Sequence, residues 1–95
     1  MQHIHDALGC IFLRLGLPKQ AMPFLIEAAR LEPGFPGVWT DLERGWREIL
    51  RTDPGDPDVH HNLGVTLKRQ GRTEEGEACF RREKALRPPP ATKPS

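Results

Sequence analysis

The chain has 95 residues, which is enough for one small domain with a modest core. Its 14 basic and 13 acidic side chains give a net charge of +1, which excludes the strong basic footprint of a dedicated nucleic-acid binder and provides no attraction to an anionic membrane. No apolar run approaches the roughly 20 residues of a membrane-spanning helix. Cys10 and Cys79 stand far apart without CxxC spacing, so we expect no disulfide framework and a reducing, cytoplasmic environment.

The N-terminal part of the chain predicts two helices. Leu8, Phe12 and Leu15 follow the i, i+4, i+7 spacing of one helical face. Gly16 ends this helix, and Pro18 suits the first turn of the next one, because an N–H has no helical partner at that position. The second helix is expected to end before the following Pro-Gly pair and to turn its apolar residues inward, namely Ala21, Phe24, Leu25, Ala28 and Leu31.

A single amphipathic helix is predicted over residues 36–51. Trp39, Leu42, Trp46 and Ile49 fall at 3-4-3 spacing on one stripe, and charged side chains occupy the opposite side. Because paired tryptophans in a small domain are mostly buried, we expect this stripe to fill the core between the helices on either side. The alternative is that the Trp39/Trp46 surface supports a homodimer.

Two more helices are predicted in the C-terminal part. Asp56 is a suitable cap and Pro57 a suitable first residue for the fourth helix, while Gly71 separates the fourth helix from the fifth. Thr73 is expected to cap the fifth helix, which ends at Pro88. The apolar residues expected to face inward are Leu63, Leu67, Ala78, Phe80 and Leu86.

The first and last helix pairs are copies of each other, 55 positions apart. His5, Leu8, Gly9, Gly16 and Pro33 fall on His60, Leu63, Gly64, Gly71 and Pro88. The spacing within each copy resembles the tetratricopeptide repeat, whose pattern is W-x2-L-G-x2-Y, then A-x3-F, then P. The matching residues are His5-x2-Leu8-Gly9-x2-Phe12, Ala21-x3-Leu25 and Pro33 in the first copy, and His60-x2-Leu63-Gly64-x2-Leu67, Gly76-x3-Phe80 and Pro88 in the second.

This resemblance implies an all-α fold in which antiparallel helix hairpins stack as a short right-handed solenoid of about five helices. An offset of 55 is shorter than two repeats of 34 residues, so the unit between the copies is shortened. We expect one helical domain over 1–87, with a repeat at 2–35, the shortened unit at 36–54 and a repeat at 57–88. Residues 88–95 are proline-rich and predicted to form a disordered tail.

One residue of the second copy departs from the pattern. Glu83 stands where the family prefers a small residue and where the first copy has Ala28. This departure predicts that the corresponding side of the last helix is open to solvent.

Relatives with this repeat use a concave face, built mostly from the first helix of each hairpin, to hold a peptide or a partner helix. Carried over by position, the first copy contributes His3, Asp6, Cys10, Leu13 and Arg14 to such a face. The last copy contributes Asp58, His61, Val65, Lys68 and Arg69. If the middle helix plays the role of a first helix, it adds Thr40, Arg44 and Arg47.

Charged residues on this face suggest a chemistry for the partner. Arg14 and Arg69, with Lys68 and Arg44, would form a mildly basic groove suited to an acidic peptide; alternatively they are ordinary solvated charges. The lysine and asparagine clamp for a C-terminal carboxylate, known in some relatives, is missing, because its slots hold Asp6, Cys10, His61 and Val65.

The sequence contains no catalytic signature, since GxSxG, Walker and HExxH patterns are absent. His3, His5, His60 and His61 raise the possibility of a metal site, but His5 and His60 fill the aromatic slot of the repeat, and His60 and His61 point about 100° apart on a helix. We therefore expect no metal and no cofactor. The predicted function is a non-catalytic scaffold for a protein or peptide; the alternative is a regulatory or docking segment of a larger enzyme, such as a glycosyl- or sulfotransferase.

Overall fold

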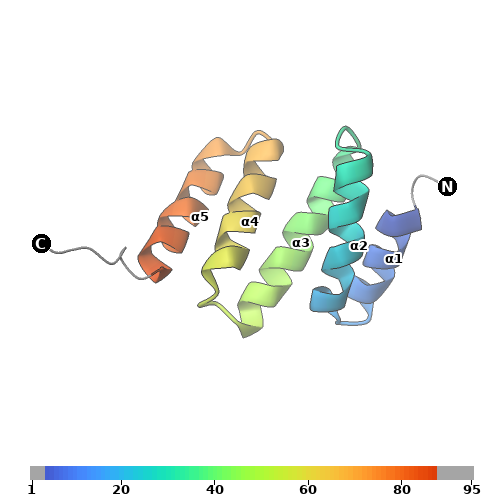
Figure 1. The fold of residues 1–95 in the computed structure, drawn as a ribbon, viewed down its shortest axis with the longest axis horizontal. Helices are drawn as coiled ribbons and strands as arrows, with labels where there is room; N and C mark the ends of the chain where they lie inside the picture. Colours follow the sequence, from blue (N-terminus) through green and yellow to red (C-terminus); the bar gives the residue numbers. More distant parts are fainter. Residues whose placement is uncertain (1–3, 88–95) are drawn as a thin grey trace, which may run out of the picture.

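The computed structural model describes residues 4–87 (Figure 1). This part of the chain folds into five α-helices that stand side by side in one row, each antiparallel to the next, with α1 at one end and α5 at the other. The helices are α1 (Ile4–Arg14), α2 (Pro18–Leu31), α3 (Pro36–Thr52), α4 (Pro57–Arg69) and α5 (Thr73–Leu86). The predicted all-α helical-repeat fold is therefore confirmed. His3 and the predicted tail lie outside the described residues.

Glycine sets the turn in both hairpins. Gly16 has φ of 77° and Gly71 has φ of 82°, a left-handed conformation that side chains other than glycine rarely adopt. In the first turn the N–H of Leu17 donates to the carbonyl of Phe12 at 2.9 Å, and in the second the N–H of Arg72 donates to Leu67 at 3.0 Å. The two copies therefore end their first helices with the same backbone geometry, as the sequence predicts.

Proline opens the three central helices, because φ near −65° and a missing N–H suit the first turn. The predicted cap of α4 is confirmed, since the carboxylate of Asp56 accepts a hydrogen bond from the N–H of Asp58 at 2.9 Å. The predicted cap of α5 is wrong. Thr73 is the first residue of that helix, and the preceding Arg72 supplies no capping side chain because a guanidinium cannot accept a hydrogen bond from a backbone N–H.

The apolar core lies mainly in α2, α3 and α4, where Leu25, Val38 and Leu67 are the largest fully buried side chains. The inward face predicted for α1 is partly wrong. Leu15 is 64% exposed, whereas Leu13 is only 8% exposed. The reason is that α1 ends the row: it packs along α2 and touches α3 only lightly, so its opposite side has no neighbouring helix.

The last hairpin contains little buried apolar surface. In α5, Phe80 is half-buried, while Ala78 and Leu86 are exposed, contrary to the prediction that all three face inward. Close approach of the two helix backbones holds α4 and α5 together instead. A methyl group on Gly76 would lie 2.8 Å from the carbonyl oxygen of Gly64, so glycine suits this position, where the repeat pattern and the first copy have alanine.

Glu83 corrects a further expectation. Its side chain is only 17% exposed and does not face open solvent. One carboxylate oxygen lies 2.9 Å from Nδ1 of His61 on α4, and the other accepts a hydrogen bond from Nε of Arg87 at 2.9 Å. The larger polar residue therefore replaces an apolar contact between the two helices with a hydrogen-bonded one.

The middle helix begins as the first helix of a repeat does. The indole Nε1–H of Trp39 donates to the carbonyl of Pro33 at 2.7 Å, and Nε2 of His60 lies 2.8 Å from the carbonyl of Pro54. In both cases the ring binds the carbonyl six residues earlier. Trp39 in α3 and His60 in α4 therefore occupy equivalent slots, which supports the aromatic-slot interpretation of His60.

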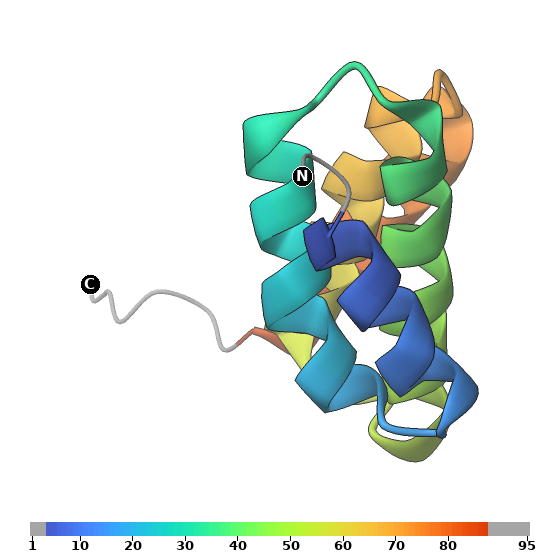
Figure 2. The same ribbon diagram turned by 90° about the vertical axis from the view of Figure 1, so that its right-hand side faces the viewer.

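Because the single helix α3 lies between the two hairpins, the helices on each side of the molecule differ from those of a regular repeat array. α3 packs along both α2 and α4, and Figure 2 shows α2 and α3 on opposite sides of the molecule. In a regular array, first and second helices alternate between the two sides. Because α3 has no partner helix of its own, α4 takes the place beside α3 that a second helix would occupy.

Candidate functional site

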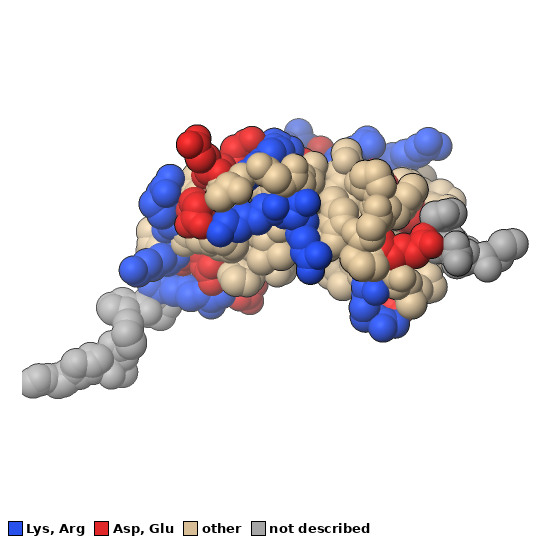
Figure 3. Space-filling view, turned by 90° about the horizontal axis from the view of Figure 1, so that it is seen from above, with Lys and Arg blue, Asp and Glu red and all other residues tan. Residues whose placement is uncertain are grey.

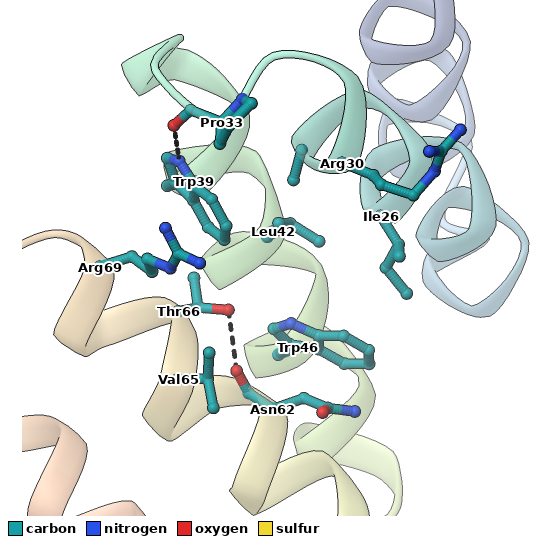
Figure 4. A pocket seen from close by; sticks show the side chains of 11 residues that line it. Ile26, Arg30, Pro33, Trp39, Leu42, Trp46, Asn62, Val65, Thr66 and Arg69 are labelled. Carbon is teal, nitrogen blue, oxygen red and sulfur yellow. Dashed lines mark hydrogen bonds between the residues drawn. The ribbon is translucent and has the colours of Figure 1, made fainter.

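A hollow of about 400 Å³ lies between α2 and α4, and α3 forms its floor (Figure 4). All residues that line it belong to these three helices or to the α2–α3 turn. Figure 3 looks down on the row of helices and shows an indentation in the middle of one long side. A volume of this size falls in the usual range of ligand pockets and can accept a few side chains of a partner.

The floor of the hollow is aromatic. Trp39 and Trp46 are the only tryptophans of the chain, and both line it together with Leu42. They stand seven residues apart, so their side chains lie two turns apart on the same face of α3. Trp46 is buried, and the hydrogen bond to Pro33 fixes the ring of Trp39 at the other end. The predicted position of the tryptophan stripe in the core is therefore correct for Trp46, whereas Trp39 is only half-buried.

The walls of the hollow expose apolar side chains. Ile26 on α2 is 48% exposed and Val65 on α4 is also exposed, although both belong to helices that contribute to the core. Exposed aliphatic groups on both sides of an aromatic floor form a concave apolar surface. Such a surface gains free energy when a partner removes it from water, at roughly 25 cal/mol per Å² of apolar area.

Polar groups in the hollow differ in what they can still bind. The hydroxyl of Thr66 donates to the carbonyl of Asn62 at 2.8 Å and is satisfied within α4. The side-chain amide of Asn62 forms no hydrogen bond within residues 4–87. Arg30 is held by Glu27 through two hydrogen bonds. The amide of Asn62 is therefore available to a partner, whereas Arg30 is already neutralised.

Arg69 is the charged group that remains available. Its guanidinium lies over the ring of Trp39, 5.1 Å from the ring centroid, in a cation–π contact. Within residues 4–87 it pairs with no carboxylate. Among residues 4–87, neither Asp nor Glu lines the hollow and its charged side chains are the two arginines; Figure 3 shows basic side chains at both rims of the indentation.

Glu43 fixes the floor helix against the last hairpin. Its carboxylate, on α3, accepts hydrogen bonds from Gln70 at 3.0 Å, Arg72 at 2.7 Å and Arg47 at 2.8 Å. Burial alone would raise the pKa of Glu43, but these three hydrogen bonds outweigh it and hold the pKa below the ordinary value of 4.5. The carboxylate is therefore ionised at neutral pH and ties α3 to the α4–α5 turn.

The structure divides the predicted partner-binding residues of α4 between two sides. Val65 and Arg69 line the hollow. Asp58, His61 and Lys68 instead face α5, where they bind Arg87 at 2.8 Å, Glu83 at 2.9 Å and Glu77 at 2.5 Å. These three residues stabilise the hairpin and do not belong to the hollow.

The predicted residues of α1 do not reach the hollow. Leu13 is buried against α2 and α3, so its expected place on an open face is wrong. Cys10 donates its S–H to Asp41 of α3 at 3.1 Å, and Asp6 lies beside this pair. Arg14 is exposed at the end of α1, far along the row from the predicted companion Arg69.

Asp6, Cys10 and Asp41 are close enough to be compared with a metal site, because their possible ligand atoms lie within 4.8 Å of one another. Burial, followed by the hydrogen bond to Asp41, raises the pKa of the Cys10 thiol to about 12. A metal requires the thiolate, which is scarce at neutral pH when the pKa is so high. The arrangement fits a hydrogen-bonded thiol between two helices.

The predicted residues of α3 lie on another side of that helix. Thr40, Arg44 and Arg47 border a separate depression with Glu43 and Glu48. None of the three lines the hollow, which takes Trp39, Leu42 and Trp46 from α3 instead. The predicted set is therefore distributed over three surfaces, because the unpaired α3 places first helices α1 and α4 on different sides of the molecule.

The sequence analysis missed the wall residues Ile26 and Arg30 on α2 and the amide of Asn62. The signal that could have found them is the odd number of helices between the two copies. With one helix in place of two, the second helix of the first copy and the first helix of the last copy flank the same side of α3.

No helix within residues 4–87 is both long enough and apolar enough to cross a membrane. Comparison with known protein families matches residues 3–35 and residues 46–78 to the tetratricopeptide repeat. The chain is also similar to cellulose synthase operon protein C of Pseudomonas fluorescens (strain SBW25), with 33% identity over 75 residues. That match covers 65% of this chain but only 6% of the relative, so the chain spans a small part of that protein.

Proposed function

We propose that this chain, which belongs to the tetratricopeptide repeat family, is a non-catalytic module that binds a peptide or helix of a partner protein in the hollow between α2, α3 and α4. Tetratricopeptide repeats generally mediate binding to partner proteins. The observation that carries the proposal is the pair of exposed aliphatic side chains, Ile26 and Val65, on opposite walls above an aromatic floor. The face expected from repeat position is a weaker candidate, because α1, α3 and α4 do not bring its residues together.

The experiment uses a matched pair of isoleucines. Ile26 in the hollow is 48% exposed and Ile11 on the outer side of α1 is 50% exposed, and both lie within helices. Ile26→Asp and Ile11→Asp therefore introduce the same charge at equal exposure. Peptides selected from a random library displayed on phage against the full chain should lose binding to Ile26→Asp and keep binding to Ile11→Asp.

The result that contradicts this proposal is equally clear. If selected peptides bind Ile26→Asp as tightly as the unmodified chain, the hollow is not the binding site. Circular dichroism of both variants serves as the control, because each must retain the helical spectrum of the parent.

A second candidate is a segment of a larger protein that positions an enzyme or another domain. It is favoured by the similarity to cellulose synthase operon protein C, in which the matching region is 6% of the length. Mass spectrometry of the native gene product tests it: a polypeptide much larger than 10.7 kDa supports this function, and one of that mass contradicts it.

Self-association through the same surface is the other alternative. A second copy would have to insert an apolar segment between Ile26 and Val65, because these are the exposed aliphatic side chains of the two walls. Sedimentation equilibrium tests it, since a monomer at all concentrations excludes the homodimer and leaves the hollow open to another partner.

A further inference from the structure

The hollow has two chemically different ends. Figure 4 places Arg69 beside Trp39 at the end near Pro33, whereas Trp46 lies at the other end near Val65. The two tryptophans mark these ends and are separated by seven residues of α3, which corresponds to about 10 Å along the helix axis. The charged end and the apolar end are therefore about 10 Å apart.

From this polarity we infer that the hollow selects an extended peptide with an acidic side chain at Arg69 and a large apolar side chain at Trp46. The inference rests on the proposed function and names the class of its ligand. An extended chain of polyproline II type rises about 3.1 Å per residue with three residues per turn, so over about 10 Å it advances by about three residues and returns its side chains to the same face. The expected motif is therefore an acidic residue and a large apolar residue three positions apart.

The contact with Trp39 lowers the free-energy cost for Arg69 to bind a carboxylate. Its guanidinium is held over the face of Trp39, so part of its hydration is already removed and its side chain is partly ordered before binding. Arginine binds carboxylates through two parallel hydrogen bonds, which are stronger than bonds between neutral groups. Because no acidic side chain within residues 4–87 lines the hollow, an acidic ligand meets no repulsion from its lining, whereas a basic ligand would be repelled by Arg69.

The apolar end is suited to a large aliphatic or aromatic side chain. Trp46 and Leu42 form its floor, and Ile26 and Val65 form its sides. The amide of Asn62 at this end can both donate and accept a hydrogen bond, which is what the backbone of an extended peptide requires. An apolar side chain inserted here would cover exposed aliphatic groups of both walls.

The amide of Asn62 favours an extended chain over a helix. A helix pairs its backbone N–H and C=O groups internally, whereas an extended segment keeps these groups free for a partner. The amide of Asn62 can bind such groups in the hollow.

The test compares two arginines that differ in position. Arg69→Glu reverses the charge at the hollow, and Arg44→Glu makes the same change on another side of α3. Random peptides displayed on phage are selected against the unmodified full chain and against both variants. The best peptides are then synthesised and titrated while tryptophan emission is recorded, because both tryptophans of the chain line the hollow.

We expect the unmodified chain and Arg44→Glu to enrich the acidic-apolar motif. Arg69→Glu should enrich peptides with a basic residue in place of the acidic one and should bind the original acidic peptide at least about ten-fold more weakly. Circular dichroism confirms that both variants are folded.

Two other outcomes overturn the inference and are distinguishable. Peptides that require Ile26 but show no acidic preference, or whose affinity is unchanged in Arg69→Glu, refute the ligand class and leave the proposed function standing. If the selection yields no peptide that depends on Ile26, the proposed function fails and this inference fails with it.

Discussion

The two hairpins share one backbone design but differ in what holds their helices together. In the first, Leu25 of α2 is fully buried over Gly9 of α1. In the last, the equivalent Phe80 of α5 lies over Gly64 but is only half-buried, with Lys68 and His61 around its ring. The difference follows from position in the row, because α2 is covered on both sides and α5 on one. The repeat pattern fixes where helices approach, while the neighbours decide how much apolar surface is buried.

Polar contacts between side chains replace part of the apolar packing in the last hairpin. Lys68–Glu77, His61–Glu83 and Arg87–Asp58 each join α4 to α5 or to the residue that follows it. Exposed pairs of this kind contribute little individually, typically about 0–1 kcal/mol. The last hairpin should therefore be the less stable of the two.

The largest expected effect is the loss of the central side chain in each hairpin. Leu25→Ala removes a fully buried residue and should lower the free energy of unfolding by about 2–5 kcal/mol. Phe80→Ala, at the matching position, should cost about 1–3 kcal/mol because part of this side chain is already exposed to water. Urea denaturation followed by circular dichroism measures both, and an equal or larger loss in Phe80→Ala would contradict the comparison.

A smaller effect is expected from the cluster that joins α3 to the last hairpin. Because the pKa of Glu43 is lowered in the folded state, its contribution is present above pH 4.5 and is lost as the pH falls through the folded-state pKa. Glu43→Gln should lower the free energy of unfolding at pH 7 by about 1 kcal/mol and reduce the loss of stability on acidification. Thermal melts between pH 3 and 7 measure this dependence.

Glu48→Gln is the control for that experiment, because Glu48 pairs only with Arg51 of its own helix, at 3.3 Å and in exposed positions. It should leave the pH profile of stability unchanged. A Glu43→Gln profile that overlies the profile of the unmodified chain would show that the cluster does not stabilise the fold.

The smallest effect is expected for single ion pairs. Glu83→Ala gives the last hairpin the residue that the first has at Ala28, and it removes contacts between α4 and α5. Glu27→Ala removes a pair within α2 alone. Both should change the thermal midpoint by about 4 °C or less, with the larger loss for Glu83→Ala. The reverse order would contradict a stabilising role for the His61–Glu83 contact.

The sequence predicts the turns and the ends of the helices better than it predicts which face of each helix is buried. Gly16 and Gly71 mark turns that require positive φ, and Pro57 marks a helix start, so these boundaries follow from backbone chemistry alone. Burial depends on neighbours, which is why Leu15, in the turn that follows α1 at the end of the row, is exposed although its spacing suggests a core position.

The candidate site was harder to predict for a related reason. Positions carried over from a regular repeat place Arg14 and Arg69 on one groove, but α2 and α3 stand between their helices in the row and only Arg69 lines the hollow. Val65 and Arg69 line the hollow, whereas the α2 wall residue Ile26 carries no family signal at all. The absence of one helix from the middle unit therefore leaves the turns and helix starts where the sequence predicts them. It changes which side chains lie together on one surface.

Nuclear magnetic resonance of the ¹⁵N-labelled chain, titrated with a peptide selected on the unmodified protein, tests binding in the hollow most directly. Two indole N–H signals are expected, one from each tryptophan, and both residues line the hollow. We predict that both indole signals shift together with the amides of Ile26 and Val65. Shifts confined to Asp6, Cys10 and Arg14, with both indole signals unchanged, would contradict the account.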